Sequence, residues 1–213
     1  MKNKTTVESI SIITNGPPAV ATPRMGDSAL IVEVLQNHFG PDGGRMHTGV
    51  EVGVHRGATS ALLLKTFPNL MLWMVDSYAA HKPDSDYRKS GDSLSKITSN
   101  EQHQHYLAAR AATEFAASRR TFCKFPSLQA VKIIPTPKLS FAFLDGAHDL
   151  NSVRNDIMAW WPRVEAGGML AGHDFNHPRD GKQFGVAQAV SEFAEFTGLH
   201  VQVLGTVWAV VKP

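Results

Sequence analysis

Short, largely apolar runs alternate with amphipathic stretches along most of the chain. The runs at residues 48–53, 70–75 and 139–144 are short for a helix, and each ends at a Gly or just before an Asp. Runs of this kind are typical of parallel strands that are buried on both faces. The stretches between them place apolar residues at helical spacing. Strands that alternate with helices across residues 48–197 predict a single doubly wound α/β sheet.

The remaining elements follow from spacing and from turn residues. A helix is predicted from Asp27 to the Gly40-Pro41 stop, and Ser99 with Gln102 is predicted to form a capping box. That box opens a helix whose apolar stripe would be Leu107, Ala111 and Phe115. Further helices are expected at 58–67, 128–134, 153–164 and 183–196, and further strands at 121–125, 169–171, 200–204 and 206–211.

Two segments do not fit the alternating pattern. Residues 1–25 contain Asn15-Gly16-Pro17-Pro18 and Pro23, which predict an irregular N-terminal arm. Residues 77–100 are polar with almost no periodicity, and a structureless stretch of that length in a compact domain is usually a lid or binding loop. The chain of 213 residues is long enough for one domain, which we place at 26–213.

The first predicted strand runs into a glycine-bearing turn and then a helix N-terminus. In α/β sheets this is where nucleotides bind, because unshielded backbone N–H groups and the helix dipole point outward there. Gly53 and Gly57 allow the backbone to approach a ligand closely, and Glu51 stands where a dinucleotide fold would have a further glycine. Asp76 ends the next strand, where its two carboxylate oxygens could accept hydrogen bonds from both ribose hydroxyls of an adenosyl ligand.

The spacing of Glu51, Gly53 and Gly57 resembles the first motif of class I S-adenosylmethionine (SAM) dependent methyltransferases. The resemblance implies a Rossmann-like methyltransferase fold, with a mostly parallel seven-stranded sheet that ends in an antiparallel hairpin. It also implies that SAM is the cofactor. The residues expected to bind it are Glu51, Gly53, Gly57, Thr59, Asp76, Ser127 and Asp145.

A second group of polar residues lies at the ends of later strands. Asp145 follows one strand, and His173 and Asp174 follow the next, so the three side chains could converge at one sheet edge. Two carboxylates and one imidazole would suit a divalent cation such as magnesium or manganese.

The stretch Asp145-Gly146-Ala147-His148-Asp149, with the glycine-rich run that ends at His173-Asp174, gives a more specific resemblance. It is similar to the metal-dependent macrocin and macrolide sugar O-methyltransferases, and more distantly to catechol O-methyltransferase. The resemblance implies that Asp145, His173 and Asp174 hold the metal and that His148 is the general base. The chain departs from that family at His173, where a carboxylate is more usual and where imidazole binds magnesium poorly.

Composition narrows the class of protein. The net charge is +2 with no basic stripe, which argues against a nucleic-acid partner, and the single cysteine, Cys123, can form no internal disulfide. No apolar run approaches membrane-spanning length and none resembles a signal peptide, so we expect a cytoplasmic protein with no membrane partner. His81, His103 and His105 are expected to be solvated. The oligomeric state stays open, a homo-oligomer included.

Together these patterns predict a SAM-dependent, metal-assisted O-methyltransferase. Its acceptor would be a small hydroxylated molecule such as a sugar, a glycosylated natural product or a phenol. The acceptor would enter past residues 77–100 and the loop 176–181, which would act as a mobile lid. Two other readings stay open: a nicotinamide-dependent oxidoreductase on a similar sheet, and a SAM-binding or sugar-binding module without turnover.

Overall fold

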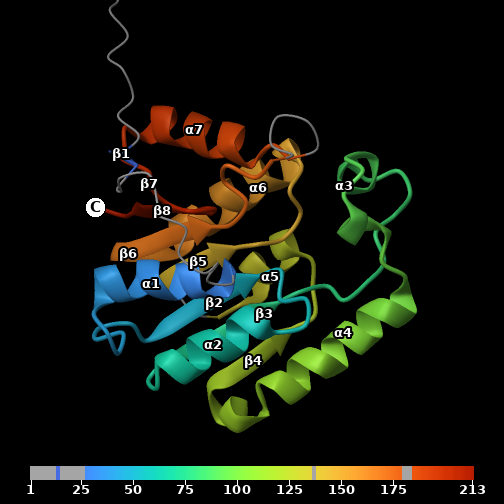
Figure 1. Cartoon of the computed structure of the whole chain (residues 1–213), viewed down its shortest axis with the longest axis horizontal. Helices are drawn as coiled ribbons and strands as arrows, with labels where there is room; N and C mark the ends of the chain where they lie inside the picture. The colour runs from blue at the N-terminus through green and yellow to red at the C-terminus, as the bar shows by residue number, and fades with distance from the viewer. Residues whose placement is uncertain (1–12, 15–26, 136–137, 179–183) are drawn as a thin grey trace, which may run out of the picture.

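The computed structural model describes residues 13–14, 27–135, 138–178 and 184–213, and it forms one eight-stranded sheet flanked by helices (Figure 1). The strand order is β1-β7-β8-β6-β5-β2-β3-β4. The strands are β1 (Ile13–Thr14), β2 (Thr48–Val52), β3 (Met71–Val75), β4 (Arg120–Cys123), β5 (Leu139–Leu144), β6 (Val164–Gly172), β7 (Gln202–Leu204) and β8 (Val207–Val211).

Seven helices of α type and three short 3₁₀ helices connect the described strands. The α-helices are α1 (Asp27–Phe39), α2 (Ala58–Thr66), α3 (Asp86–Lys89), α4 (Ser99–Ala112), α5 (Ser127–Ile133), α6 (Leu150–Trp160) and α7 (Val186–Thr197). The 3₁₀ helices are η1 (Ser93–Lys96), η2 (Glu114–Arg119) and η3 (Trp161–Arg163).

The pairing of the strands confirms the predicted doubly wound sheet. Strands β4, β3, β2, β5 and β6 pair in parallel, while β8 pairs antiparallel with both β6 and β7. The C-terminal hairpin is therefore present as expected. The eighth strand, β1, adds a two-residue parallel edge to β7 and comes from the segment predicted to be an irregular arm. The rest of that arm lies outside the described residues.

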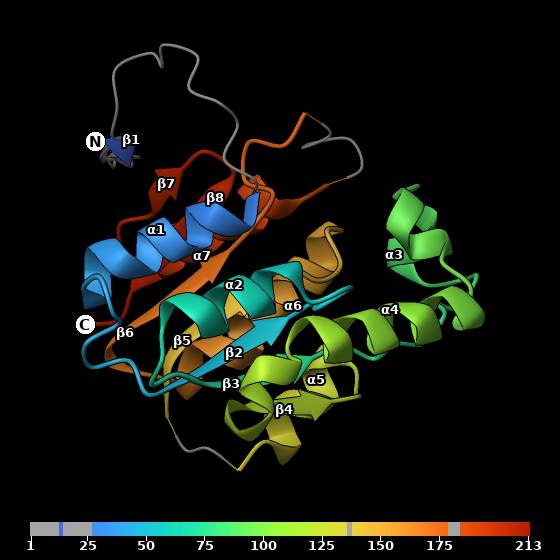
Figure 2. The ribbon, with the colours of Figure 1, turned by 60° about the horizontal axis from the view of Figure 1, so that its bottom comes forward.

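Two hydrophobic layers hold the sheet, one on each face (Figures 1 and 2). On one face, α5, α6 and α7 pack on the sheet around the fully buried Trp160. On the other, α1 and α2 pack with Ala109 of α4. Trp160 lies on α6, in the segment 153–164 that was predicted to be helical. The sheet is thus covered on both faces, which leaves its carboxyl edge open for a ligand.

The segment at residues 77–100 differs from its prediction, because it contains α3 and η1. The predicted capping box was also wrong by one position. Thr98 and Glu101 form it, with the Glu101 carboxylate accepting from the Thr98 backbone N–H at 2.8 Å. Ser and Thr are equally good caps in a sequence, and only the helix start decides between them. In Figure 2, α3 and α4 extend beyond the end of the sheet.

The expected apolar stripe of α4 was wrong as well. Leu107 and Phe115 are 42% and 53% exposed, whereas His105, expected to be solvated, is buried on the opposite face. Helix α4 packs through its small residue Ala109 against Gly57. A Cβ atom added to Gly57 would lie 2.9 Å from the Cα atom of Ala109. Close backbone packing, and not side-chain hydrophobicity, therefore decides which face of α4 is buried.

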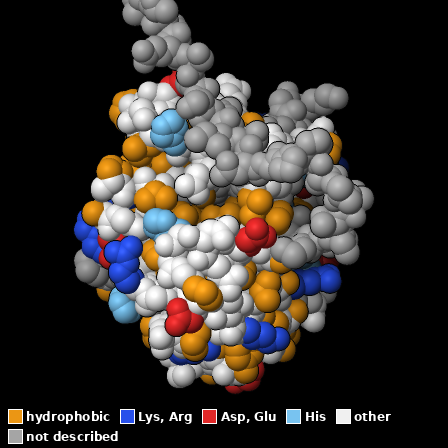
Figure 3. Space-filling view, turned by 60° about the vertical axis from the view of Figure 1, so that its left-hand side comes forward, with side chains coloured by type: hydrophobic (Ala, Val, Ile, Leu, Met, Phe, Trp, Pro, Cys, Tyr) orange, Lys and Arg blue, Asp and Glu red, His pale blue; other side chains and the backbone are white. Residues whose placement is uncertain are grey.

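Charged groups on the outer surface are dispersed. On the face in Figure 3, the described Lys and Arg side chains lie in separate small groups among hydrophobic and uncharged ones. Within the described ranges, no helix is both long enough and apolar enough to cross a membrane.

Candidate active site

A cavity of about 610 Å³ lies at the carboxyl ends of the parallel strands. The ends of β2, β3 and β5 each contribute a polar or glycine residue to its wall, namely Gly53, Asp76 and Asp145. Ser127 at the start of α5 and Asp156 on α6 line the same cavity. Four of the residues expected to bind the cofactor therefore face one cavity, since parallel strands end at the same edge.

Gly53 is required by the backbone at this point. Its φ angle is +91°, and a Cβ atom there would lie 2.0 Å from the carbonyl oxygen of Asp145. No side chain fits such a distance. The glycine thus lets the turn after β2 and the end of β5 approach each other, which brings the two walls of the cavity together.

Asp76 organises the turn that follows β2. One carboxylate oxygen accepts hydrogen bonds from the backbone N–H groups of Val54 and His55 at 3.1 and 3.0 Å, and the other accepts from Tyr78 at 2.9 Å. Oδ2 thus already accepts two hydrogen bonds, whereas Oδ1 accepts one and can still accept a hydrogen bond from a hydroxyl of a ligand in the cavity. The ribose contact stays a prediction.

Glu51 lies beneath the turn and does not line the cavity. Its carboxyl is 1% exposed and accepts a short hydrogen bond from the Ser60 hydroxyl. Burial raises the pKa of Glu51 to about 8, and the negative charges of Asp145 and Asp76 raise it further. The hydrogen bond from Ser60 acts in the opposite direction but is outweighed. At neutral pH this side chain is therefore mostly protonated. Its expected contact with the cofactor stays a prediction.

Gly57 and Thr59 also lie away from the cavity wall. Gly57 adopts a φ of +78° at the N-terminus of α2, where α4 crosses it. The Thr59 hydroxyl is hydrogen-bonded to Ser28 at 2.8 Å and so joins α2 to α1. In the structure these two residues serve helix packing.

Ser127 is held by a residue to which the sequence gave no role. Its hydroxyl donates to Asp156 at 2.6 Å and accepts from Trp160 Nε1 at 2.9 Å. Burial raises the pKa of Asp156 to about 6, although the Ser127 hydrogen bond opposes this. The Asn155-Asp156 pair was visible in the sequence, but its reach to Ser127 depends on how α5 and α6 pack.

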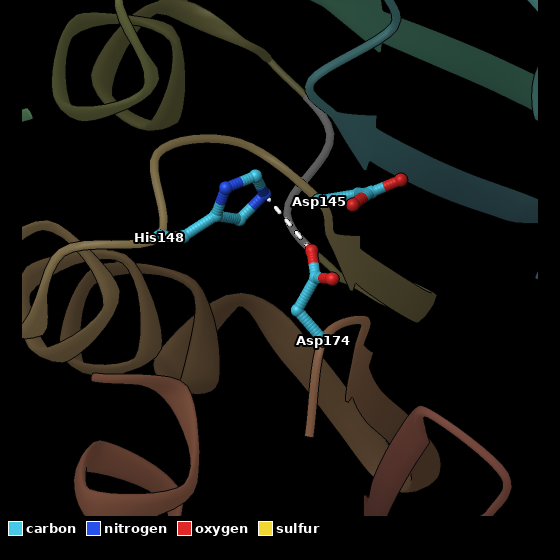
Figure 4. A group of neighbouring side chains, drawn as sticks. All are labelled: Asp145, His148 and Asp174. Carbon is cyan, nitrogen blue, oxygen red and sulfur yellow. Dashed lines mark ion pairs between the residues drawn. The ribbon is translucent and has the colours of Figure 1, made fainter. Parts of the chain in front are cut away.

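Asp145, His173 and Asp174 come together, as the strand ends predicted, and His148 lies with them. His148 Nε2 lies 3.0 Å from Asp174 Oδ2, and Figure 4 shows this ring and carboxylate pointing toward each other beside Asp145. Ligand atoms of Asp145, His148 and Asp174 all lie within 4.8 Å of one another. His173 Nδ1 lies 3.5 Å from Asp145 and 3.3 Å from the same Asp174 oxygen.

Both histidines are held by carboxylates. Burial alone would lower the pKa of His148, but hydrogen bonds with Asp174 and Asp92 outweigh it and raise that pKa to about 9. In the same way Asp145 and Asp174 overcome burial and raise the pKa of His173 to about 10. Burial would raise the pKa of Asp174, yet its two imidazole partners hold it well below its usual value. Two imidazolium rings thus balance carboxylate charge where a cation could bind.

Asp92 is the site residue that sequence reasoning missed. It lies in the polar stretch 77–100, and its carboxylate accepts a hydrogen bond from His148 Nδ1 at 2.7 Å. The sequence signal was slight: an Asp followed by Ser93 and Leu94 at the start of a short helix. The loop at 176–181, expected to be a lid, is described only as far as residue 178.

Comparison with known proteins defines the class. A family model described as a methyltransferase domain matches residues 50–175, more than half of the chain, which spans β2 to the end of β6 and includes the residues above. The chain therefore belongs to this methyltransferase family, and it is a class I SAM-dependent methyltransferase. Of the two enzyme classes that the sequence left open, the family match supports the methyltransferase and not the nicotinamide-dependent oxidoreductase. No curated protein matches the chain in sequence.

Solved structures support the same fold. The O-methyltransferase NovP has a TM-score of 0.62 at 16% identity, with 85% of this chain and 79% of that chain covered. The calicheamicin methyltransferase CalS11 has a TM-score of 0.61 at 14% identity, with 85% and 77% covered. The N-methyltransferase NodS from Bradyrhizobium japonicum WM9 has a TM-score of 0.54 at 14% identity, with 86% and 91% covered. Enzymes that methylate different atoms share this fold, so the fold leaves the acceptor open.

Proposed function

We propose that this methyltransferase transfers the methyl group of SAM to a hydroxyl oxygen of a small molecule, with the help of a divalent cation. The observation that carries the proposal is the convergence of Asp145, His148 and Asp174, of which Asp145 lines the 610 Å³ cavity. The sugars, glycosylated natural products and phenols expected from the sequence remain the acceptor classes to test. NovP, described as an O-methyltransferase, supports transfer to an oxygen atom, and CalS11, described as a calicheamicin methyltransferase, supports a natural-product acceptor.

The cavity suits the adenosyl part of SAM. Asp76 would accept hydrogen bonds from the ribose hydroxyls, and Ser127 beside Phe125 would lie near the adenine ring. Phe125 is 46% exposed on the cavity wall, where a planar base could cover it. The methyl donor would then lie towards Asp145. SAM is already a strong electrophile, so the protein has mainly to align donor and acceptor.

The donor set suits a divalent cation. The carboxylates of Asp145 and Asp174 would hold it, and His173 Nδ1, which faces both of them, would supply a third ligand. A bound divalent cation lowers the pKa of an acceptor hydroxyl that it contacts. The neutral form of His148, which is the minor form at pH 7 because its pKa is about 9, would take the hydroxyl proton at Nε2, the nitrogen that faces Asp174, whereas Nδ1 is bonded to Asp92. Phe184 stacks on the His148 ring at 4.4 Å and keeps water from that side.

The test uses labelled SAM, a panel of sugars, glycosylated natural products and phenols, and the full chain. Chelation, and separately Asp174→Ala, should abolish transfer while the affinity for S-adenosylhomocysteine changes by less than about threefold, because the cation contacts the acceptor and not the adenosyl group. Asp42→Asn is the matched control, since Asp42 lies in an exposed turn and bonds only to the Gly44 backbone.

Full activity in excess chelator would refute the metal's role. Binding of SAM without transfer to any member of the panel would favour the non-catalytic module, the one other function that the sequence left open. Transfer to an amine or carbon acceptor in preference to a hydroxyl would refute the proposed O-methylation.

A further inference from the structure

Asp92 is a buried carboxylate in the segment that carries α3 and η1. It is 2% exposed and stands at the N-terminus of η1, where its Oδ1 atom accepts from the Leu94 backbone N–H at 3.0 Å. Its Oδ2 atom has two different partners: the Tyr87 hydroxyl donates to it at 3.1 Å, and His148 Nδ1 lies 2.7 Å away. One oxygen therefore caps a helix, and the other faces the candidate active site.

The contact with His148 joins two parts of the fold that are far apart in the chain. His148 follows β5, whereas Asp92 belongs to the segment that carries α3 and η1. The His148 ring lies between Asp92 on its Nδ1 side and Asp174 on its Nε2 side. A second hydrogen bond, from Asn151 of α6 to Asp86 of α3 at 3.1 Å, fixes the same segment beside the cavity. The polar stretch is thus docked on the site by specific contacts.

We propose that Asp92 is the positioning residue for His148: its carboxylate fixes the ring through Nδ1, so that Nε2 points toward Asp174 and the proposed cation site. This inference rests on the proposed methyl transfer. An imidazole has two nitrogens, and the partner of one decides the role of the other. Because Asp92 comes from the α3–η1 segment, His148 is oriented only when that segment is docked.

The two oxygens of Asp92 allow the positioning role to be separated from helix capping. In Asp92→Asn, the amide oxygen can still accept from Leu94 at the Oδ1 position. The NH₂ group then faces His148 Nδ1, so a hydrogen-bond acceptor becomes a donor and the ring loses the partner that fixes it. The variant keeps the shape and the cap of the wild type. Thr98→Ala is the matched control, because it removes the capping hydrogen bond of the neighbouring helix α4 without touching His148.

The experiment measures kcat and KM for SAM in wild type, Asp92→Asn and Thr98→Ala, using the acceptor found in the panel. For Asp92→Asn we expect kcat to fall about 100-fold or more with KM for SAM within about threefold, and for Thr98→Ala we expect both to stay near wild type. A loss in Asp92→Asn no larger than in Thr98→Ala would overturn the proposal. So would an equal loss of kcat and of affinity for SAM, since that indicates a collapsed site.

A spectroscopic measurement tests the contact without any acceptor. In protein labelled with ¹⁵N-histidine, the Nδ1 proton of His148 should be shielded from exchange with water, and its signal is assigned by its absence in His148→Ala. We expect the signal in wild type and Thr98→Ala and its loss in Asp92→Asn. Its persistence in Asp92→Asn would overturn the proposal. If wild type transfers no methyl group at all, the proposed function fails, while this signal still decides whether Asp92 positions His148.

Discussion

The buried carboxyl of Glu51 makes the stability of the fold depend on pH. Its pKa rises from the ordinary value of 4.5 to about 8 in the folded protein. Between these values the folded state holds a proton that the unfolded state has released, so the free energy of unfolding falls as the pH rises. Over the whole interval the loss is about 5 kcal/mol, from 3.5 pKa units at 1.36 kcal/mol each, and about 70% of it has occurred by pH 7.

Glu51→Gln removes this titration and keeps the shape of the side chain and a partner for Ser60. Compared with wild type, the variant should therefore gain stability as the pH rises, by about 4 kcal/mol between pH 5 and pH 9. Urea unfolding of both proteins at several pH values measures the difference directly, and groups common to both cancel. A difference that stays constant within about 1 kcal/mol across this range would show that Glu51 is ionised in the folded protein, and the reasoning would be wrong.

Three further outcomes follow from the site. Gly53→Ala should lower the free energy of unfolding, measured in urea, by about 3 kcal/mol, because the new methyl group would meet the Asp145 carbonyl at a strained φ angle. An unchanged urea midpoint of unfolding would contradict this. Binding of Mg²⁺, followed by calorimetry, should release protons and should become tighter as the pH rises towards 9. The reason is that the cation competes with the ring protons of His148 and His173, whose pKa values are raised. Binding that does not depend on pH would count against the site. His173→Ala should weaken Mg²⁺ binding at least tenfold, because His173 is a proposed ligand. His148→Ala should leave Mg²⁺ binding within about threefold and lower kcat about 100-fold, because His148 is the proposed base. The reverse pattern would exchange the roles of the two histidines.

The strand ends were predictable because they depend on local pattern. A buried parallel strand needs a continuous apolar run, and the residue after it must lie at the carboxyl edge. Asp76 and Asp145 could therefore be placed beside one cavity from their positions after residues 75 and 144. His173 and Asp174 could be brought to Asp145 by the same reasoning, since β5 and β6 are neighbours in the sheet, whereas the role of His148 was implied only by the family resemblance.

The helices outside the sheet were less predictable. The buried face of α4 depends on Ala109 meeting Gly57, a contact across more than fifty residues that no spacing reveals. The capping residue shifted by one position for a similar reason, because Thr98 and Ser99 offer the same hydroxyl and the helix start is set by packing.

The sequence by itself determined the order of the strands along the chain, the turn that contains Gly53, and the kinds of side chain that end each strand. These follow from hydrophobic period and turn chemistry, which act over a few residues. Only the tertiary structure decided that Glu51 is buried under Ser60, that Asp156 holds Ser127, and that Asp92 reaches His148. Such contacts join segments tens of residues apart or depend on depth below the surface, and burial and long-range packing are properties of the whole fold.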